Sequence, residues 1–364
     1  MKIKSKAALF SKVGEPLEII EYEFSDTVKD GMVLCKVLLS TICGSDLHTI
    51  MGRRNEPAPL ILGHEIIGEI VALGQGVGKD GFGNELKIGD RITWTIMASC
   101  GSCFYCLHDL PQKCEKLYKY GHTCFNDPPH LTGGYSEYIW LYPGTTVYRI
   151  PDSLSDQAAT PANCALSTVI NAVDSIDLKR DETVLIQGAG LLGLNLVALA
   201  AEAGAKKIFI SDVMQSRLDL AKQFGADICF NLKEMTPDQV DREIRNNTGG
   251  YGVDVAFEVC GVKNVVKQAV QVLRIGGRYL IAGLVTPGSD LDIDGNQLTR
   301  KYLTIKGIHN YHPRHLGMAL KFLEKHHQKY PYDDLVGKIY PLSEINDAIA
   351  LAETGKFARI AVKP

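Results

Sequence analysis

Four cysteines stand close together in this 364-residue sequence, at the spacing C-x2-C-x2-C-x7-C. Thiolates held this close repel one another unless a cation neutralises them, and Zn²⁺ accepts four sulfur ligands in a closed tetrahedron. Four ligands leave no open position, which predicts a structural zinc that holds a lobe together. An iron–sulfur cluster is the alternative, because runs of cysteines also ligate those. The four residues are Cys100, Cys103, Cys106 and Cys114.

Two further segments carry residue types that bind metals. The first is Cys43-Gly44-Ser45-Asp46-Leu47-His48, and the second is Gly63-His64-Glu65. Taken singly, Cys43 is typical of a small buried hydrophobe and His64 of a histidine in the core. Because the same sequence also contains the four-cysteine cluster and the dinucleotide-binding pattern described next, we interpret the two segments as a second, catalytic metal site.

A glycine pattern in the middle of the chain predicts a dinucleotide site. Gly188-Ala189-Gly190-Leu191-Leu192-Gly193 follows a strand-like run and opens a helix. Its glycines permit a tight turn, close approach of the backbone to a pyrophosphate, and close packing of the helix on the strand. Asp212 lies 24 residues beyond Gly188, near the offset of the acid that binds the ribose hydroxyls of NAD. We expect NAD rather than NADP, although Arg217 is a nearby cation. A turn followed by a helix-capping aspartate is the alternative.

The elements around these motifs follow two patterns. Short strand-like runs punctuated by glycine and proline dominate the first part, as in a barrel-like β domain. From Asp156 to Asp174 the apolar spacing predicts a helix, and beyond it strands alternate with helices, which indicates a doubly wound parallel sheet. The last residues do not continue this series, so we expect the chain to return to the first domain.

Composition narrows the class of protein. The chain is 45% hydrophobic and 22% charged with a formal net charge of -3, so neither nucleic acid binding nor disorder is favoured. Residues 1–10 lack the apolar core of a secretory signal, and we expect a cytoplasmic protein without a disulfide framework. The uncharged run 183–201 is nearly long enough for a membrane span. Its glycines and two polar residues favour a buried strand and helix instead, and we expect no membrane partner.

Together and in this order, these features resemble the zinc-containing alcohol dehydrogenase branch of the medium-chain dehydrogenase/reductase superfamily. The resemblance covers nearly the whole chain and also includes Gly89-Asp90-Arg91. It implies an α/β protein with a GroES-like β-rich catalytic domain over 1–165, a Rossmann NAD-binding domain over 166–305, and a return to the catalytic domain over 306–364. It further implies two zinc ions per chain and NAD-dependent conversion of an alcohol to an aldehyde or ketone. We expect a homodimer or homotetramer.

The resemblance also assigns the catalytic zinc. Its implied ligands are Cys43, His64 and Cys164, with the fourth position left for water or alcohol. Asp46 resembles the acid that orients the liganding histidine. Glu65 is expected to act beside the ligands, or to ligate transiently while water exchanges.

Three more residues receive roles in the same way. Ser45 resembles the hydroxyl that takes the alcohol proton, and His48 resembles the outer base that passes it through the cofactor ribose to solvent. Arg359 matches a basic position that some family members direct at the pyrophosphate. The alternatives are a turn residue, a surface histidine and an exposed strand arginine, respectively.

The substrate is less constrained. Gly52-Arg53-Arg54-Asn55 lies in a loop that borders the substrate cleft in this family, and two guanidinium groups can clamp a phosphate or carboxylate. A solvated pair of charges is the alternative reading. The region resembles dehydrogenases proposed to accompany phosphonate catabolism, so we expect a phosphonate- or phosphate-bearing alcohol. Polyols and amino alcohols, as in the sorbitol and threonine branches, remain open.

Two other classes of protein are weighed against an alcohol dehydrogenase. A non-catalytic relative that only binds the cofactor would be expected to lack a zinc ligand or a relay group. A zinc-free quinone or enoyl reductase would lack both the four-cysteine lobe and the catalytic ligands. The sequence retains all of these residues, which favours the enzyme.

Overall fold

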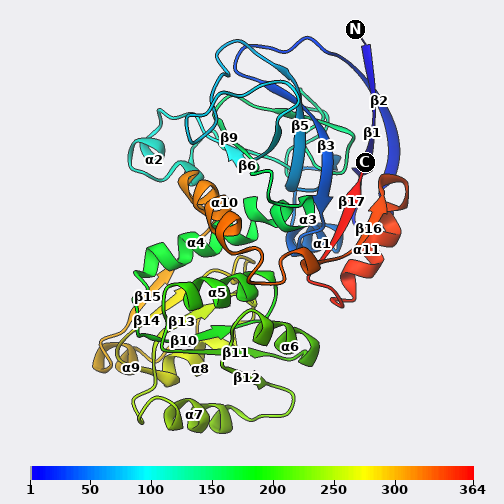
Figure 1. Ribbon diagram of the computed structural model, residues 1–364. Coiled ribbons are helices and arrows are strands. Elements are labelled where there is room, and N and C mark those ends of the chain that lie inside the picture. The colour runs from blue at the N-terminus through cyan, green and yellow to red at the C-terminus, as the bar shows by residue number, and fades with distance from the viewer. Residues whose placement is uncertain (1) are drawn as a thin grey trace. The chain divides into compact units, whose positions relative to one another are not determined.

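The computed structural model describes residues 2–364, and the chain forms two compact units. The first contains residues up to 167 together with 311–364, and the second contains 168–310. The sequence placed these boundaries after residues 165 and 305. The chain thus leaves the first unit once and returns to it (Figure 1).

The first unit is built mainly from β-strands that curl around apolar cores. One sheet has the order β2-β1-β4, and the larger has the order β16-β17-β3-β5-β6-β7, with β8 paired to β3 and β9 to β6. Only β16 and β17 run parallel; the other pairs are antiparallel. The strands are β1 (Lys2–Phe10), β2 (Glu18–Ser25), β3 (Val33–Thr41), β4 (Leu60–Ile61), β5 (Glu65–Leu73), β6 (Arg91–Ala98), β7 (Tyr118–Lys119), β8 (Tyr138–Leu141), β9 (Thr145–Arg149), β16 (Val336–Pro341) and β17 (Arg359–Lys363).

Short helices join these strands. Trp94, in β6, and Tyr120 are fully buried in one of these cores, so the side of β6 that carries Trp94 is closed to water. The α-helices are α1 (Gly44–Ile50), α2 (Phe104–Leu107), α3 (Asp156–Ala159), α10 (Arg314–His326) and α11 (Ile345–Glu353), and the 3-10 helices are Pro111–Lys113, Thr160–Asn163, Asp333–Leu335 and Leu342–Glu344.

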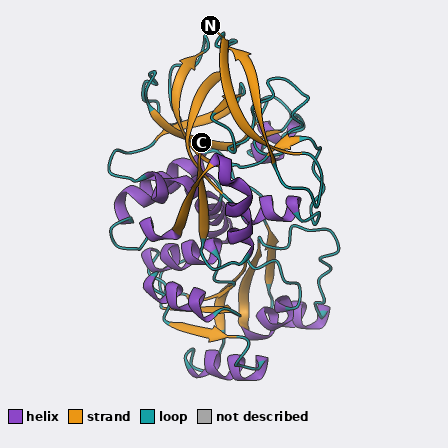
Figure 2. Ribbon diagram, turned by 90° about the vertical axis from the view of Figure 1, so that its right-hand side faces the viewer, coloured by secondary structure: helices purple, strands orange, loops and turns teal. Residues whose placement is uncertain are grey.

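The second unit is a six-stranded parallel sheet with helices on either side of it (Figure 2). Its order is β12-β11-β10-β13-β14-β15, so successive strands are added on one side of β10 and then, from β13, on the other. Doubly wound sheets bind their ligands at this switch point. Central β10 is buried along its whole length, as expected of a parallel strand covered on both faces. The strands are β10 (Thr183–Gln187), β11 (Lys207–Asp212), β12 (Ile228–Asn231), β13 (Val253–Glu258), β14 (Leu273–Ile281) and β15 (Thr304–Gly307), and the helices are α4 (Ala165–Ile176, whose first turn belongs to the first unit), α5 (Leu191–Glu202), α6 (Gln215–Gln223), α7 (Pro237–Asn246), α8 (Val265–Val272) and α9 (Gly295–Arg300).

The expected α/β organisation is confirmed, with one local correction. The helix predicted over 156–174 is interrupted: α3 passes into the 3-10 helix Thr160–Asn163, and α4 begins only at Ala165. Pro161 lacks the N–H that a continuous α-helix would use. Cys164, at the break, adopts φ -125° and ψ -78°. The interruption therefore places Cys164, which the sequence proposed as a zinc ligand, between two helices rather than within one.

The run 183–201, which approached the length of a membrane span, forms β10, a glycine turn and most of α5. Across the described residues, no helix is both long and apolar enough to cross a membrane.

Candidate zinc and cofactor sites

A buried carboxylate organises the segment that carries the first proposed ligand. Cys43 precedes α1, and its backbone N–H donates to Asp46 Oδ2 at 2.9 Å. Asp46 has no exposed surface, and it also accepts hydrogen bonds from Gly63 N at 3.3 Å and from the Tyr135 hydroxyl at 3.2 Å. One side chain thus joins the start of α1, the turn before β5 and the segment that contains Tyr135.

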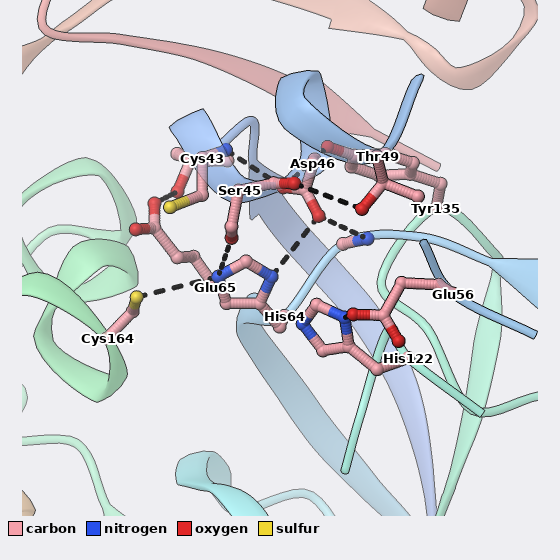
Figure 3. A network of polar contacts seen from close by, with 12 residues as sticks. Cys43, Ser45, Asp46, Thr49, Glu56, His64, Glu65, His122, Tyr135 and Cys164 are labelled. Atoms are coloured by element: carbon pink, nitrogen blue, oxygen red, sulfur yellow. Dashed lines mark hydrogen bonds and ion pairs between the residues drawn. The ribbon is translucent and has the colours of Figure 1, made fainter. Parts of the chain in front are cut away.

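The same carboxylate orients His64. His64 Nδ1 lies 3.2 Å from Asp46 Oδ1, so we assign the ring proton to Nδ1. The lone pair of Nε2 then points toward the cysteines, as a zinc ligand requires (Figure 3). Gly63 makes the turn possible, because its φ is +89° and a Cβ atom there would lie 2.8 Å from the Tyr135 ring.

Cys164 reaches the same place from the interrupted helix. Its Sγ lies 3.5 Å from His64 Nε2. The neighbouring Asn163 amide donates to the carbonyl oxygens of His64, at 3.0 Å, and of Trp94, at 3.1 Å. The Tyr311 hydroxyl donates in turn to the Asn163 carbonyl. These bonds fix the break in the helix, and with it the Cys164 sulfur.

The resulting cluster suits a metal ion. One ligand atom from each of Cys43, His64, Glu65 and Cys164 lies within 4.8 Å of the others. Two sulfurs and an imidazole nitrogen are the donors that zinc prefers. The Cys164 thiol and the Arg359 guanidinium lower the pKa of Cys43 well below its ordinary value, which favours the thiolate that a metal binds. The donor set therefore fits a zinc ion with one position left open.

Glu65 and Arg359 form a buried ion pair beside this cluster. Arg359 Nε and Nη2 donate to the two Glu65 oxygens at 2.6 and 2.7 Å, and Thr41 Oγ1 donates to Glu65 Oε2 at 2.5 Å. Arg359 was expected to contact the pyrophosphate; in the structure the residue is 8% exposed, its guanidinium pairs with Glu65, and its Nη2 lies 3.7 Å from Cys43 Sγ. The Glu65 carboxylate is matched to a guanidinium, which favours a supporting role over transient ligation.

The proposed relay residues lie on α1. Ser45 Oγ is 3.3 Å from His64 Nε2, so its hydroxyl is beside the metal-binding atoms. His48 lies one turn further along and is partly buried, and its Nδ1 has no hydrogen-bond partner among the described residues. Burial and the nearby Arg53 guanidinium hold the pKa of His48 below its ordinary value. The ring is therefore neutral near pH 7 and able to accept a proton.

The paired arginines differ in their surroundings. Arg53 is exposed, whereas Arg54 Nε lies 2.5 Å from Glu56 Oε1. His122 Nδ1 lies 3.0 Å from the same oxygen, and the His122 ring packs against that of His64 with centroids 5.3 Å apart. A symmetric two-arginine clamp is thus not what the structure contains. His122 was missed from the sequence, because nothing in its spacing relates it to Glu56 or His64.

The sulfurs of the four-cysteine lobe converge on one point. Neighbouring sulfurs lie 3.5 Å apart for Cys103 and Cys106, 3.8 Å for Cys103 and Cys114, and 3.5 Å for Cys114 and Cys100. Sulfurs that share a tetrahedral zinc at ~2.3 Å lie roughly 3.8 Å apart. Hydrogen bonds from Ser102 lower the pKa of Cys100 to about 6. Four sulfur donors at this separation fit a closed zinc site.

The glycine pattern lies at the start of α5. Gly190 is the N-cap of that helix, and Leu191 and Leu192 form its first turn, so unpaired backbone N–H groups are available for phosphate. A Cβ atom on Gly193 would lie 1.9 Å from the Gly188 carbonyl oxygen, which explains the third glycine.

Asp212 ends β11 beside this turn. Its Oδ2 accepts from Ala189 N at 2.8 Å and its Oδ1 from Met214 N at 2.9 Å. The carboxylate therefore supports the glycine turn, and each oxygen retains a lone pair for a ribose hydroxyl. The N-cap of α6 is Met214 rather than Asp212. Arg217, in α6, is half-buried.

Comparisons with known proteins agree with this arrangement. Residues 29–152 match the alcohol dehydrogenase GroES-like domain, and residues 192–325 match the zinc-binding dehydrogenase family. The 5-exo-hydroxycamphor dehydrogenase of Pseudomonas putida is 32% identical over 89% of this chain and 90% of that protein. An L-threonine 3-dehydrogenase of Francisella tularensis is 31% identical over 80% of this chain and 79% of that protein. The crystal structure of an alcohol dehydrogenase from Thermotoga maritima matches all of both chains with a TM-score of 0.94 at 31% identity.

The chain belongs to the zinc-containing medium-chain alcohol dehydrogenase family. The expected combination of a GroES-like domain with a Rossmann domain is confirmed, as is the class of activity, oxidoreduction of an alcohol with zinc and a nicotinamide cofactor. An alcohol dehydrogenase from Escherichia coli CFT073 was solved with NADH (TM-score 0.85, 26% identity, 99% of both chains). A zinc-binding dehydrogenase from Sinorhizobium meliloti 1021 was solved with NADP (TM-score 0.84, 26% identity, 100% of both chains).

We predict two zinc ions per chain, one in each cluster. Cys43→Ala should reduce the metal content to about one and abolish turnover while the fold persists, because its site has an open position. Cys103→Ala should instead lower the melting temperature or solubility, because a closed site contributes folding energy. Elemental analysis and thermal unfolding of the three proteins measure both effects. Wild-type protein with one zinc or fewer would contradict this assignment.

We predict that Arg359→Met destabilises the protein by about 3–5 kcal/mol, because Glu65 would be left as an unpaired buried charge. Adding Glu65→Gln should recover part of this loss, since the buried group would then be neutral. The exposed Arg242 provides the control, and Arg242→Met should change stability by less than about 0.5 kcal/mol. Urea unfolding of the zinc-loaded proteins measures these differences, and a loss below about 1 kcal/mol for Arg359→Met would show that the pair is not required.

Proposed function

We propose that the enzyme oxidises a secondary alcohol with NAD at the site formed by Cys43, His64 and Cys164. The observation that carries this proposal is the three-donor cluster, in which Asp46 fixes His64 and a fourth metal position remains for the substrate. Zinc held there would lower the pKa of the alcohol hydroxyl, and NAD would supply the acceptor for the hydride from the carbon that bears this hydroxyl. The similar proteins named for threonine and 5-exo-hydroxycamphor support a secondary alcohol.

The proton leaves through α1 in this proposal. Ser45 Oγ accepts the proton of the alcohol hydroxyl and donates its own onward, since it lies beside His64 Nε2. His48, three residues later on the same face of the helix, accepts that proton on its neutral ring and releases it to solvent. Asp46 positions the other groups and lies outside this path, because its carboxylate already accepts hydrogen bonds from Cys43 N, Gly63 N and the Tyr135 hydroxyl.

The ion pair of Glu65 and Arg359 affects the charge of the neighbouring Cys43. Their bidentate pairing places a positive guanidinium within 3.7 Å of Cys43 Sγ without adding net charge. This arrangement stabilises the Cys43 thiolate that binds the metal. Both residues are therefore positioning residues in this proposal.

Dependence on Ser45 tests the proton path. Ser45→Ala should reduce kcat by roughly hundredfold or more, because general acid–base groups contribute about 10²–10⁴-fold. His48→Gln should have a smaller effect that excess imidazole in the buffer partly restores. Both variants should retain two zinc ions, and the exposed Ser343→Ala should behave as wild type. Turnover of Ser45→Ala within about threefold of wild type would exclude this relay.

Cofactor choice tests Asp212. We predict a higher kcat/KM with NAD than with NADP, because the Asp212 carboxylate would face the added 2′-phosphate. Asp212→Ala should narrow the difference by removing that repulsion, whereas Asp219→Ala, which removes an exposed carboxylate from α6, should not. Steady-state kinetics with both cofactors measures the ratio. Equal efficiency of the wild-type enzyme with NAD and NADP would refute the assignment.

A further inference from the structure

One cation near the zinc ligands has no partner. Lys119 ends β7, half-buried, and its ammonium makes no hydrogen bond or ion pair with any described residue. Its backbone is held in place: Met97 pairs with it across β6 and β7, and its carbonyl accepts from Thr123 Oγ1 at 3.0 Å. A charged group that is partly removed from water and left unpaired is unfavourable unless a ligand completes it.

The neighbouring carboxylate is already occupied. The carboxylate of Glu56, in the loop that follows α1, raises the pKa of Lys119 electrostatically, and its Oε1 contacts both Arg54 Nε, at 2.5 Å, and His122 Nδ1, at 3.0 Å. Its charge is therefore balanced by Arg54. The group formed by Arg54, Glu56, His122 and Lys119, here called the cationic group, retains one positive charge in excess.

The cationic group adjoins the proposed reaction centre. The His122 ring packs against that of the proposed zinc ligand His64, and the His122 backbone N–H donates to the Lys119 carbonyl oxygen at 3.3 Å, so Lys119 and His122 share one turn. Burial and the positive Arg54 lower the pKa of Lys119 to about 8, so the ammonium remains mostly charged near pH 7. The Lys119 ammonium is therefore free to bind an anionic group of a substrate.

A second polar atom in the same group also lacks a partner. His122 is 7% exposed, and its Nε2 has no hydrogen-bond partner among the described residues. Because Nδ1 faces Glu56, Nε2 is the acceptor of the ring. An apolar substrate would leave the Lys119 ammonium unpaired, which disfavours such a ligand, whereas an anion would accept from the ammonium and a hydroxyl group or water could donate to His122 Nε2.

We propose that Lys119 selects alcohols that bear an acidic group, a carboxylate or a phosphonate, by donating charge-assisted hydrogen bonds to that anion. The proposal rests on the proposed function, because the alcohol hydroxyl must occupy the open zinc position while the anion contacts Lys119. It differs from a clamp by Arg53 and Arg54, since Arg54 is paired and Arg53 is exposed. Lys119 is thus the specificity-determining residue.

A matched series of substrates tests this inference. 2-Butanol, 3-hydroxybutyrate and 2-hydroxypropylphosphonate, all racemic, share the CH3–CH(OH)–CH2 unit and differ in the attached group. Steady-state kinetics with NAD compares wild type with Lys119→Met, which removes the charge, and Lys119→Arg, which restores a cation. Lys116→Met, at an exposed lysine three residues earlier, is the matched control.

The expected result is selective. Lys119→Met should lose roughly ten- to hundredfold in kcat/KM on at least one acid and less than about threefold on 2-butanol. Lys119→Arg should recover most of that loss, and Lys116→Met should match wild type. The acid that is affected more identifies the preferred anion. Equal losses on all three alcohols would indicate a structural lysine, and unchanged kinetics would exclude its contact with substrate; either result overturns the proposal.

A binding measurement keeps this test independent of turnover. Each acid is titrated calorimetrically into the NADH-bound enzyme, in which the alcohol cannot be oxidised. Wild type should bind an acid roughly ten- to hundredfold more tightly than Lys119→Met does. If wild type with two zinc ions oxidises no alcohol, the proposed function fails while the titration still decides the role of Lys119. If wild type oxidises 2-butanol but Lys119→Met binds both acids as wild type does, only the present inference fails.

Discussion

The buried carboxylate of Asp46 is the interaction on which the catalytic site depends. A charge without exposed surface is tolerated only when donors surround it. Here the donors come from Cys43, Gly63, His64 and Tyr135, so solvating one carboxylate requires three separate segments to meet. Two of those segments carry proposed zinc ligands. The requirement to solvate Asp46 therefore also brings Cys43 and His64 together.

A second buried charge ties the end of the chain to the same place. Glu65 follows the ligand His64 directly, and Arg359 opens β17, which pairs with β3. Their bidentate contact requires the last segment to return to the first unit after the dinucleotide-binding unit is complete. The discontinuous first unit is thus explained by chemistry at its site as well as by the pairing of strands.

Local patterns in the sequence predicted most of the elements, and the residues proposed as zinc ligands lie together in two clusters. Cysteine spacing, the glycine turn and the alternation of strands with helices are short-range signals, and each reflects a local geometric requirement. The contacts that were missed are long-range. Nothing near Arg359 in sequence indicates Glu65, and nothing near His122 indicates Glu56. The break at Cys164 also escaped prediction, because its apolar neighbours keep helical spacing while bonds between Asn163 and distant carbonyls fix a different backbone.

The four-cysteine lobe connects stability with specificity. It lies between two strands that pair with each other: β6 ends at Ala98, the lobe spans Cys100 to Cys114, and β7 begins at Tyr118. A closed metal site fixes such an excursion far better than a few exposed apolar side chains, because ligand bonds supply the folding energy that a small lobe lacks. The segment that leaves the lobe carries Lys119 and then His122, which packs against His64. A structural zinc bound by the lobe would therefore also fix the position of Lys119 and His122, the groups proposed to lie at the substrate, while taking no part in the reaction.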